Sequence, residues 1–113
     1  MDLTIDLNNY KVKGSKVFTG RDRGIEIREE TKIDSFFTNE SDSDNLTIII
    51  PTEVMSINPS FLEEFLFNIV NKLGKEKFYQ KVKFSNESNR YDINEDLEEA
   101  IDRILRANNA LTK

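Results

Sequence analysis

Apolar and polar positions are most clearly ordered between residues 45 and 74. Leu46 to Ile50 form a short apolar run, rich in β-branched residues, between a polar cluster and Pro51. A run of this length between breakers predicts a strand that is buried on both faces. Strands of that kind belong to sheets that helices cover on both sides. We therefore expect this strand at the centre of the fold.

A helix is predicted from Pro59 to Leu73. Asn58 is a good N-cap, and proline suits the first helical position because its missing N–H has no partner there. Gly74 follows the last apolar residue and predicts the helix end. One broad face is apolar and contains Phe61, Leu62, Phe65, Leu66, Ile69, Val70 and Leu73. Phe67 lies on the polar side, where a neighbouring segment covers it or a partner contacts it.

Residues 1–18 are predicted to form N-terminal strands. Apolar and polar residues alternate over positions 3–7, and residues 10–13 and 16–18 are short strand candidates. We expect an antiparallel hairpin here. The charged stretch that follows predicts a surface helix over residues 22–33, because its acidic and basic residues have i,i+3 and i,i+4 spacing.

The chain after Gly74 predicts a short strand and a further helix. Residues 76–80 suit one helical turn with Phe78 inward, and residues 82–84 suit a strand. Asn94 is expected to cap a C-terminal helix over residues 94–109. That helix has an apolar stripe made of Leu97, Ala100, Ile101, Ile104 and Leu105.

This order of elements indicates the α/β class. Strands and helices alternate along the chain, which predicts a small mixed sheet with helices packed against it. The 113 residues fit one domain. We therefore expect a single domain over residues 1–113, with the strand, loop and helix of residues 46–74 at its centre.

The composition removes several classes of function. The chain has no cysteine and no histidine, which excludes thiol nucleophiles, histidine-based triads and ordinary zinc sites. The acidic segment 39–45 lacks the residue order of a calcium loop, so no metal and no cofactor is expected. A net charge of -5 argues against direct nucleic-acid binding. No signal-peptide pattern and no membrane-length apolar run is present, so we expect a cytoplasmic protein.

Four short motifs resemble STAS-like domains, the fold of bacterial anti-sigma-factor antagonists, and in particular a STAS-like family without an assigned function. The first is the Phe18-Thr19-Gly20-Arg21 turn with Gly24, which opens a charged helix. The second and third are the strand Leu46–Ile50 and the entry Ser56–Phe61 into an apolar helix. The last is the Leu73-Gly74 stop, followed by Phe78 and a strand that ends at Phe84. The resemblance covers residues 16–84.

The resemblance implies a non-enzymatic interaction module that binds a regulatory partner, an ATPase-type kinase or a regulator, through the loop over residues 55–60 and the helix over residues 59–73. In antagonist STAS domains the central loop reads Asp-Ser-Ser-Gly, and a partner kinase of the ATPase type phosphorylates its second serine. The matching positions here are Asn58, Pro59, Ser60 and Phe61, so Ser60 is the candidate phospho-acceptor. The implied partner-binding residues are Met55, Ser56, Asn58, Ser60 and Phe67, and self-association into a homodimer is open. A phosphate in the first helical turn would gain from backbone N–H groups and the helix dipole.

Two other functions fit the sequence. Gly20, Arg21, Arg23 and Gly24 could hold a phosphate or nucleotide through arginine forks and helix-start amides, although no P-loop motif is present. Alternatively, the chain could be a phage or mobile-element inhibitor of a host protein. Its acidic face would then be formed by Glu95, Asp96, Glu98, Glu99 and Asp102.

Overall fold

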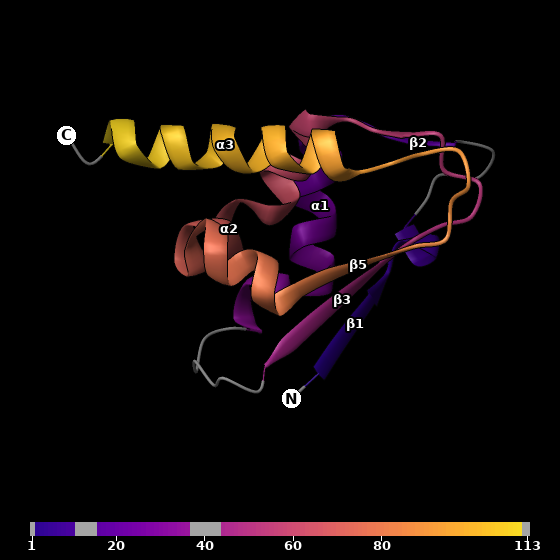
Figure 1. The fold of residues 1–113 in the computed structure, drawn as a ribbon, viewed down its shortest axis with the longest axis horizontal. Helices are drawn as coiled ribbons and strands as arrows, with labels where there is room; N and C mark the ends of the chain where they lie inside the picture. Colours follow the sequence, from indigo (N-terminus) through magenta and orange to yellow (C-terminus); the bar gives the residue numbers. More distant parts are fainter. Residues whose placement is uncertain (1, 11–15, 37–43, 112–113) are drawn as a thin grey trace.

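The computed structural model describes the backbone of residues 2–10, 16–36 and 44–111, and side chains through residue 107. A three-stranded sheet has the order β1-β3-β5, formed by β1 (Asp2–Asp6), β3 (Asn45–Ile50) and β5 (Val82–Asn86). A second, two-stranded sheet pairs β2 (Val17–Phe18) with β4 (Ser56–Ile57). The predicted small α/β fold is confirmed (Figure 1).

The strand directions differ from the prediction. All pairs among the described residues are parallel, so the expected mixed sheet is wrong in this respect. The antiparallel N-terminal hairpin is also wrong, because β1 pairs with β3 and β2 pairs with β4, while Leu7–Tyr10 form the 3-10 helix η1. Apolar alternation shows that a segment is a strand, but the choice of partner is made by long-range packing. The candidate strand over residues 11–13 lies outside the described residues.

The central strand is covered on one face. Leu46, Ile48 and Ile50 are fully buried, whereas Thr47 and Ile49 are partly exposed. Figure 1 shows the α-helices on one side of the three strands. Burial on both faces, as the apolar run predicted, is therefore wrong. The prediction failed because Ile49, an apolar residue, lies on the partly exposed face of β3 and made the sequence run look uniformly apolar.

Three α-helices form the covering layer. The first helix, α1 (Arg21–Thr31), ends at Lys32, which adopts a left-handed conformation with φ 55°, and the 3-10 helix η2 (Ile33–Ser35) follows. The predicted helix over residues 22–33 is confirmed within a turn. The second helix, α2 (Pro59–Lys81), is interrupted at Gly74, whose φ is 80°. This break confirms the predicted helix end, and a second helical segment then leads directly into β5.

The third helix, α3 (Asn94–Leu111), begins where the sequence placed it, but with a different cap. The carboxylate of Asp92 accepts a hydrogen bond from the backbone N–H of Asn94 at 2.9 Å. The prediction that Asn94 is the cap is therefore wrong. Both residues are good N-terminal cap types, and the neighbouring turn decides between them.

The core is centred on α2, which packs against α1 on one side and α3 on the other. Phe61, Phe65 and Phe78 are completely buried, and the Phe61 ring lies 5.4 Å from the ring of Phe18. The α1–α2 crossing is close at Gly24, where an added Cβ would lie 2.6 Å from the carbonyl oxygen of Phe61. Among the helices of the described chain, none combines the length and apolar character needed to cross a membrane.

Candidate functional site

The candidate site is the 55–60 loop, defined as residues 55–60, which contains the short strand β4 and the first two residues of α2. It lies beside the turn that leads from β2 into α1, because two backbone hydrogen bonds join them. The N–H of Asn58 donates to the carbonyl of Phe18 at 2.8 Å, and that of Met55 donates to Lys16 at 2.7 Å. The carboxyl ends of the two short parallel strands thus open side by side, each directly before a helix.

The start of α2 is firmly capped. The side-chain oxygen of Asn58 accepts a hydrogen bond from the N–H of Ser60 at 2.7 Å, and Pro59 occupies the first turn, as predicted. The N–H groups of Phe61 and Leu62 donate to the carbonyl of Asn58 at 3.0 and 3.2 Å. The first-turn amides are therefore already bonded. The expectation that a phosphate on Ser60 would meet free amides is wrong for this conformation.

Exposed apolar side chains border the loop. Among the described residues, three large hydrophobic side chains stand out as exposed, namely Met55 at 48%, Val17 at 43% and Tyr79 at 39%. Val17 pairs in register with Ser56, the neighbour of Met55. The backbones of two of the three, Val17 and Met55, are therefore close together at this loop. The sequence identified Met55 but not Val17, because the pairing of β2 with β4 is visible only in the tertiary structure.

Phe67 lies apart from the loop. It is seven residues after Ser60 on α2, which corresponds to about 10 Å along the helix axis. Its ring is partly buried and packs against the core. The structure brings Met55, Ser56, Asn58 and Ser60 together at the start of α2, and Phe67 lies about two turns further along the helix, on the same face as Ser60.

The four residues of the predicted anion site have separate structural roles. The guanidinium of Arg21 lies 3.3 Å from the carboxylate of Glu63 and 3.8 Å from that of Glu64. Arg23 instead pairs with Glu26 and donates to the backbone carbonyl of Tyr10.

The two glycines of the predicted anion site have conformational and packing roles. Gly20 precedes α1 with a φ of 93°, and Gly24 is buried at the α1–α2 crossing. The arginine forks are thus directed at internal partners, which does not favour the anion-binding alternative.

The acidic residues of α3 are partly engaged within the molecule. Asp102 lies 3.3 Å from the amine of Lys75, and Glu99 lies 3.4 Å from the guanidinium of Arg103. Asp96 accepts a hydrogen bond from Tyr91. Glu95 and Glu98 are exposed. The acidic face of the inhibitor alternative is therefore smaller than the sequence suggested.

Tyr91 holds the 55–60 loop through its hydroxyl group, and its role was not predicted from the sequence. Its hydroxyl lies 2.6 Å from the carboxylate of Asp96 and 3.1 Å from the carbonyl of Ile57. Burial, followed by the hydrogen bond and charge of Asp96, raises the pKa of Tyr91 well above its usual value. This residue ties β4 to the start of α3. A lone tyrosine in a polar segment, five residues before an aspartate, was the only signal in the sequence.

Within the described residues, no group of histidine, cysteine or acidic side chains could hold a metal ion. The acidic residues 39–43 lie outside this part of the chain. A model of a protein family described as a STAS-like domain of unknown function matches residues 52–92. This match spans the 55–60 loop, α2 and β5, and it confirms the resemblance that the sequence motifs indicated. Comparisons with curated proteins and with solved structures find no match.

Proposed function

We propose that this chain, whose residues 52–92 match a STAS-like domain, is a non-enzymatic module that binds a regulatory protein through the 55–60 loop. Domains of this kind are generally non-catalytic and are associated with protein interaction. The partner that we propose is an ATPase-type kinase or a regulator related to one. Ser60 is then the residue whose modification releases the partner.

The exposed pair Met55 and Val17 is the observation that carries this proposal. Burying a large apolar side chain completely is worth roughly 1.5–3 kcal/mol. Since each of these side chains is nearly half exposed in the free molecule, a partner that covers it would gain about half of that value. A polar substitution at either position should therefore weaken the complex about tenfold.

A phosphate on Ser60 would act through charge. Glu63 and Glu64 follow Ser60 by three and four residues, so all three lie on one face of α2. Arg21 is held by these two carboxylates. A phosphate would add nearly two negative charges beside them and compete for the guanidinium of Arg21. The surface of the loop would become strongly anionic, which would disfavour an apolar contact through Met55.

The partner is best identified by site-specific cross-linking. A photoreactive amino acid at position 55 should capture one protein from the native cell, whereas the same group at Glu29, exposed on α1, should not. Capture of the same proteins from both positions would count against a specific surface at the loop.

Calorimetry with the purified partner then tests the residues. Met55→Asp and Ser60→Asp should each weaken binding at least about tenfold. Ser85→Asp is the matched control, because Ser85 is exposed on β5 and receives the same charge. Unchanged binding by both loop variants, with the fold intact by circular dichroism, would refute the proposed surface.

The kinase proposal has a separate test. Incubation with the partner and ATP should place a phosphate on Ser60, detected by mass spectrometry, and Ser60→Ala should remain unmodified. A partner without ATPase-type kinase activity would refute this part of the proposal. A captured nuclease or other defence protein would instead favour the inhibitor alternative.

A further inference from the structure

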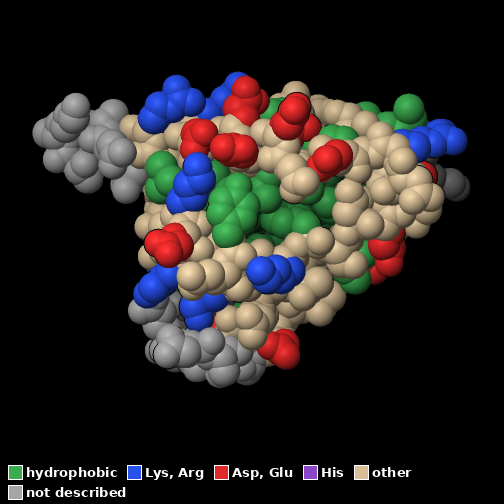
Figure 2. Space-filling model, viewed as in Figure 1, with side chains coloured by type: hydrophobic (Ala, Val, Ile, Leu, Met, Phe, Trp, Pro, Cys, Tyr) green, Lys and Arg blue, Asp and Glu red, His purple; other side chains and the backbone are tan. Residues whose placement is uncertain are grey.

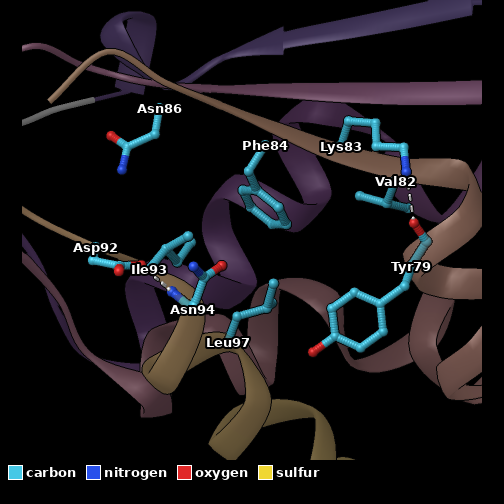
Figure 3. A pocket seen from close by; sticks show the side chains of 9 residues that line it. All are labelled: Tyr79, Val82, Lys83, Phe84, Asn86, Asp92, Ile93, Asn94 and Leu97. Carbon is cyan, nitrogen blue, oxygen red and sulfur yellow. Dashed lines mark hydrogen bonds between the residues drawn. The ribbon is translucent and has the colours of Figure 1, made fainter.

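A second surface lies near the C-terminal end of α2, between β5 and α3. A pocket of about 370 Å³ is lined there by Tyr79, Val82, Phe84, Ile93 and Leu97, together with polar residues at its ends. Figure 3 shows Phe84 and Leu97 directed toward one another across the space, with the Tyr79 ring at the end near α2. Both β5 and α3 contribute residues to this pocket, which we call the groove, and Figure 1 shows that the two elements run in opposite directions.

One wall of the groove is formed by β5, which is an edge strand of the three-stranded sheet. In the order β1-β3-β5, the strand β5 has a neighbour on one side only, as far as residues 2–10, 16–36 and 44–111 are concerned. The N–H of Glu87 donates to Ile50 of β3 at 3.0 Å. Because every second residue of a parallel strand directs its N–H and C=O to the same neighbour, Ser85 also faces β3. The backbone groups of Phe84 and Asn86 therefore point outward, toward a position where the described chain supplies no strand.

The side chains of Phe84 and Asn86 lie on the apolar face of the sheet, in register with Ile48 and Ile50. A strand added beside β5 would thus place alternate side chains in the groove, against Phe84 and Leu97. The edge spans five residues, or about 17 Å. This length fits a short extended peptide, which is the recognition mode in which main-chain bonds give affinity and alternate pockets give specificity.

The rim of the groove is predominantly acidic on the α3 side. Figure 2 shows acidic side chains above the apolar patch and a cationic side chain below it. Asp92 lines the pocket. Burial, followed by the nearby charges of Glu98 and Asp102, raises the pKa of Tyr79, against the lowering effect of Lys75. That lysine is itself paired, since its amine lies 3.3 Å from the carboxylate of Asp102. Lys83 also lines the pocket, but its amine is used within the molecule, where it donates a hydrogen bond to the backbone carbonyl of Tyr79 at 3.0 Å.

We propose that the groove and the free edge of β5 bind an extended segment of another protein. Its groove-facing positions carry an apolar residue flanked, two residues away on each side, by lysine or arginine. The apolar side chain covers Phe84 and the exposed ring of Tyr79, above the buried Leu97, and the cations meet Asp92 and Glu98 at the two ends. A second copy of this chain fits less well, because its net charge of -5 and its acidic α3 would face the same features.

The probe is a synthetic peptide, Thr-Lys-Thr-Ile-Thr-Lys-Thr, acetylated and amidated, added to the isotope-labelled full chain. Amide chemical shifts should change over residues 82–86 and 93–98. Glu98→Lys should weaken binding about tenfold, and Glu29→Lys, the same change on α1, should leave it unaltered. A peptide with glutamate in place of lysine should not bind. Shift changes elsewhere, none at all, or insensitivity to Glu98→Lys would overturn the proposal.

Methylation of the peptide backbone tests strand addition itself. N-methyl groups on the alternate amides that face β5 should abolish binding, while methylation of the other set should preserve it. An equal loss with both sets would overturn pairing with the edge. Sedimentation of the chain alone must also show a monomer, since a dimer disrupted by the peptide would make a second copy the occupant. Met55→Asp should bind the peptide normally, which separates this surface from the 55–60 loop.

Discussion

Removal of the Tyr91 hydroxyl tests how the 55–60 loop is held in place. The substitution Tyr91→Phe keeps the ring and deletes the group that lies 2.6 Å from Asp96 and 3.1 Å from Ile57. A hydrogen bond to a charged group contributes roughly 1.5–3 kcal/mol. Because Tyr91 is only partly buried, we expect the lower part of this range, about 1.5–2 kcal/mol. For a chain of this length, that corresponds to a melting temperature lower by roughly 5–10 °C.

Thermal unfolding followed by circular dichroism measures this change. In a double-mutant cycle, Tyr91→Phe should cost much less when Asp96 is already alanine, because the charged acceptor is gone. A melting temperature within about 2 °C of that of the unmodified chain would contradict the stabilising role of this hydroxyl. So would a full effect of Tyr91→Phe in the Asp96→Ala background.

The same residue gives the stability of the chain a pH dependence. Burial and Asp96 raise the pKa of Tyr91 in the folded state above its ordinary value of 10.0. Above about pH 10, the unfolded chain therefore releases a proton that the folded chain keeps, and the free energy of unfolding falls as the pH rises. Below that pH, Tyr91 is protonated in both the folded and the unfolded chain, so its titration no longer makes the free energy of unfolding depend on pH. The free energy of unfolding should fall less at alkaline pH in the Tyr91→Phe variant than in the unmodified chain. Equal pH profiles for the two chains would contradict this expectation.

Replacing Gly24 or Gly74 should lower the free energy of unfolding for two different reasons, crowding at Gly24 and backbone strain at Gly74. Gly24→Ala places a Cβ 2.6 Å from the carbonyl of Phe61, so overpacking at the helix crossing should cost about 1–3 kcal/mol, offset by roughly 0.5–1 kcal/mol of helix propensity. Gly74→Ala meets no atom within 4 Å, but its φ of 80° and ψ of 167° suit only glycine, so strain should cost about 1–3 kcal/mol. Urea unfolding of the alanine and valine variants separates the two. The cost should increase with side-chain volume at Gly24, and a similar dependence on volume at Gly74 would contradict the strain argument.

Much of the local structure was predictable because its causes lie within a few residues. Asn58 and Pro59 define the start of α2, and Gly74 defines the break within it, since capping and backbone conformation are local properties. The helical repeat correctly assigned the buried face of α2. Met55, which is exposed, was named because of the resemblance to STAS-like domains and not from a local pattern.

The errors concern relations between segments. The sequence could not show that β1 joins β3 in parallel, or that β2 pairs with β4 and brings Val17 to the 55–60 loop. It also missed the bonds of Tyr91, whose partners Ile57 and Asp96 lie on different elements.

The α/β class, the main helices and the position of the central loop are readable from local patterns, because hydrophobic periodicity and capping residues act over one or two turns of the chain. The strand partners, the single covered face of the sheet and the internal pairing of Arg21 and Arg23 became visible in the folded chain. The same is true of the groove beside β5. These features depend on which segments meet across long stretches of chain, and that choice minimises the energy of the whole core rather than of any one segment.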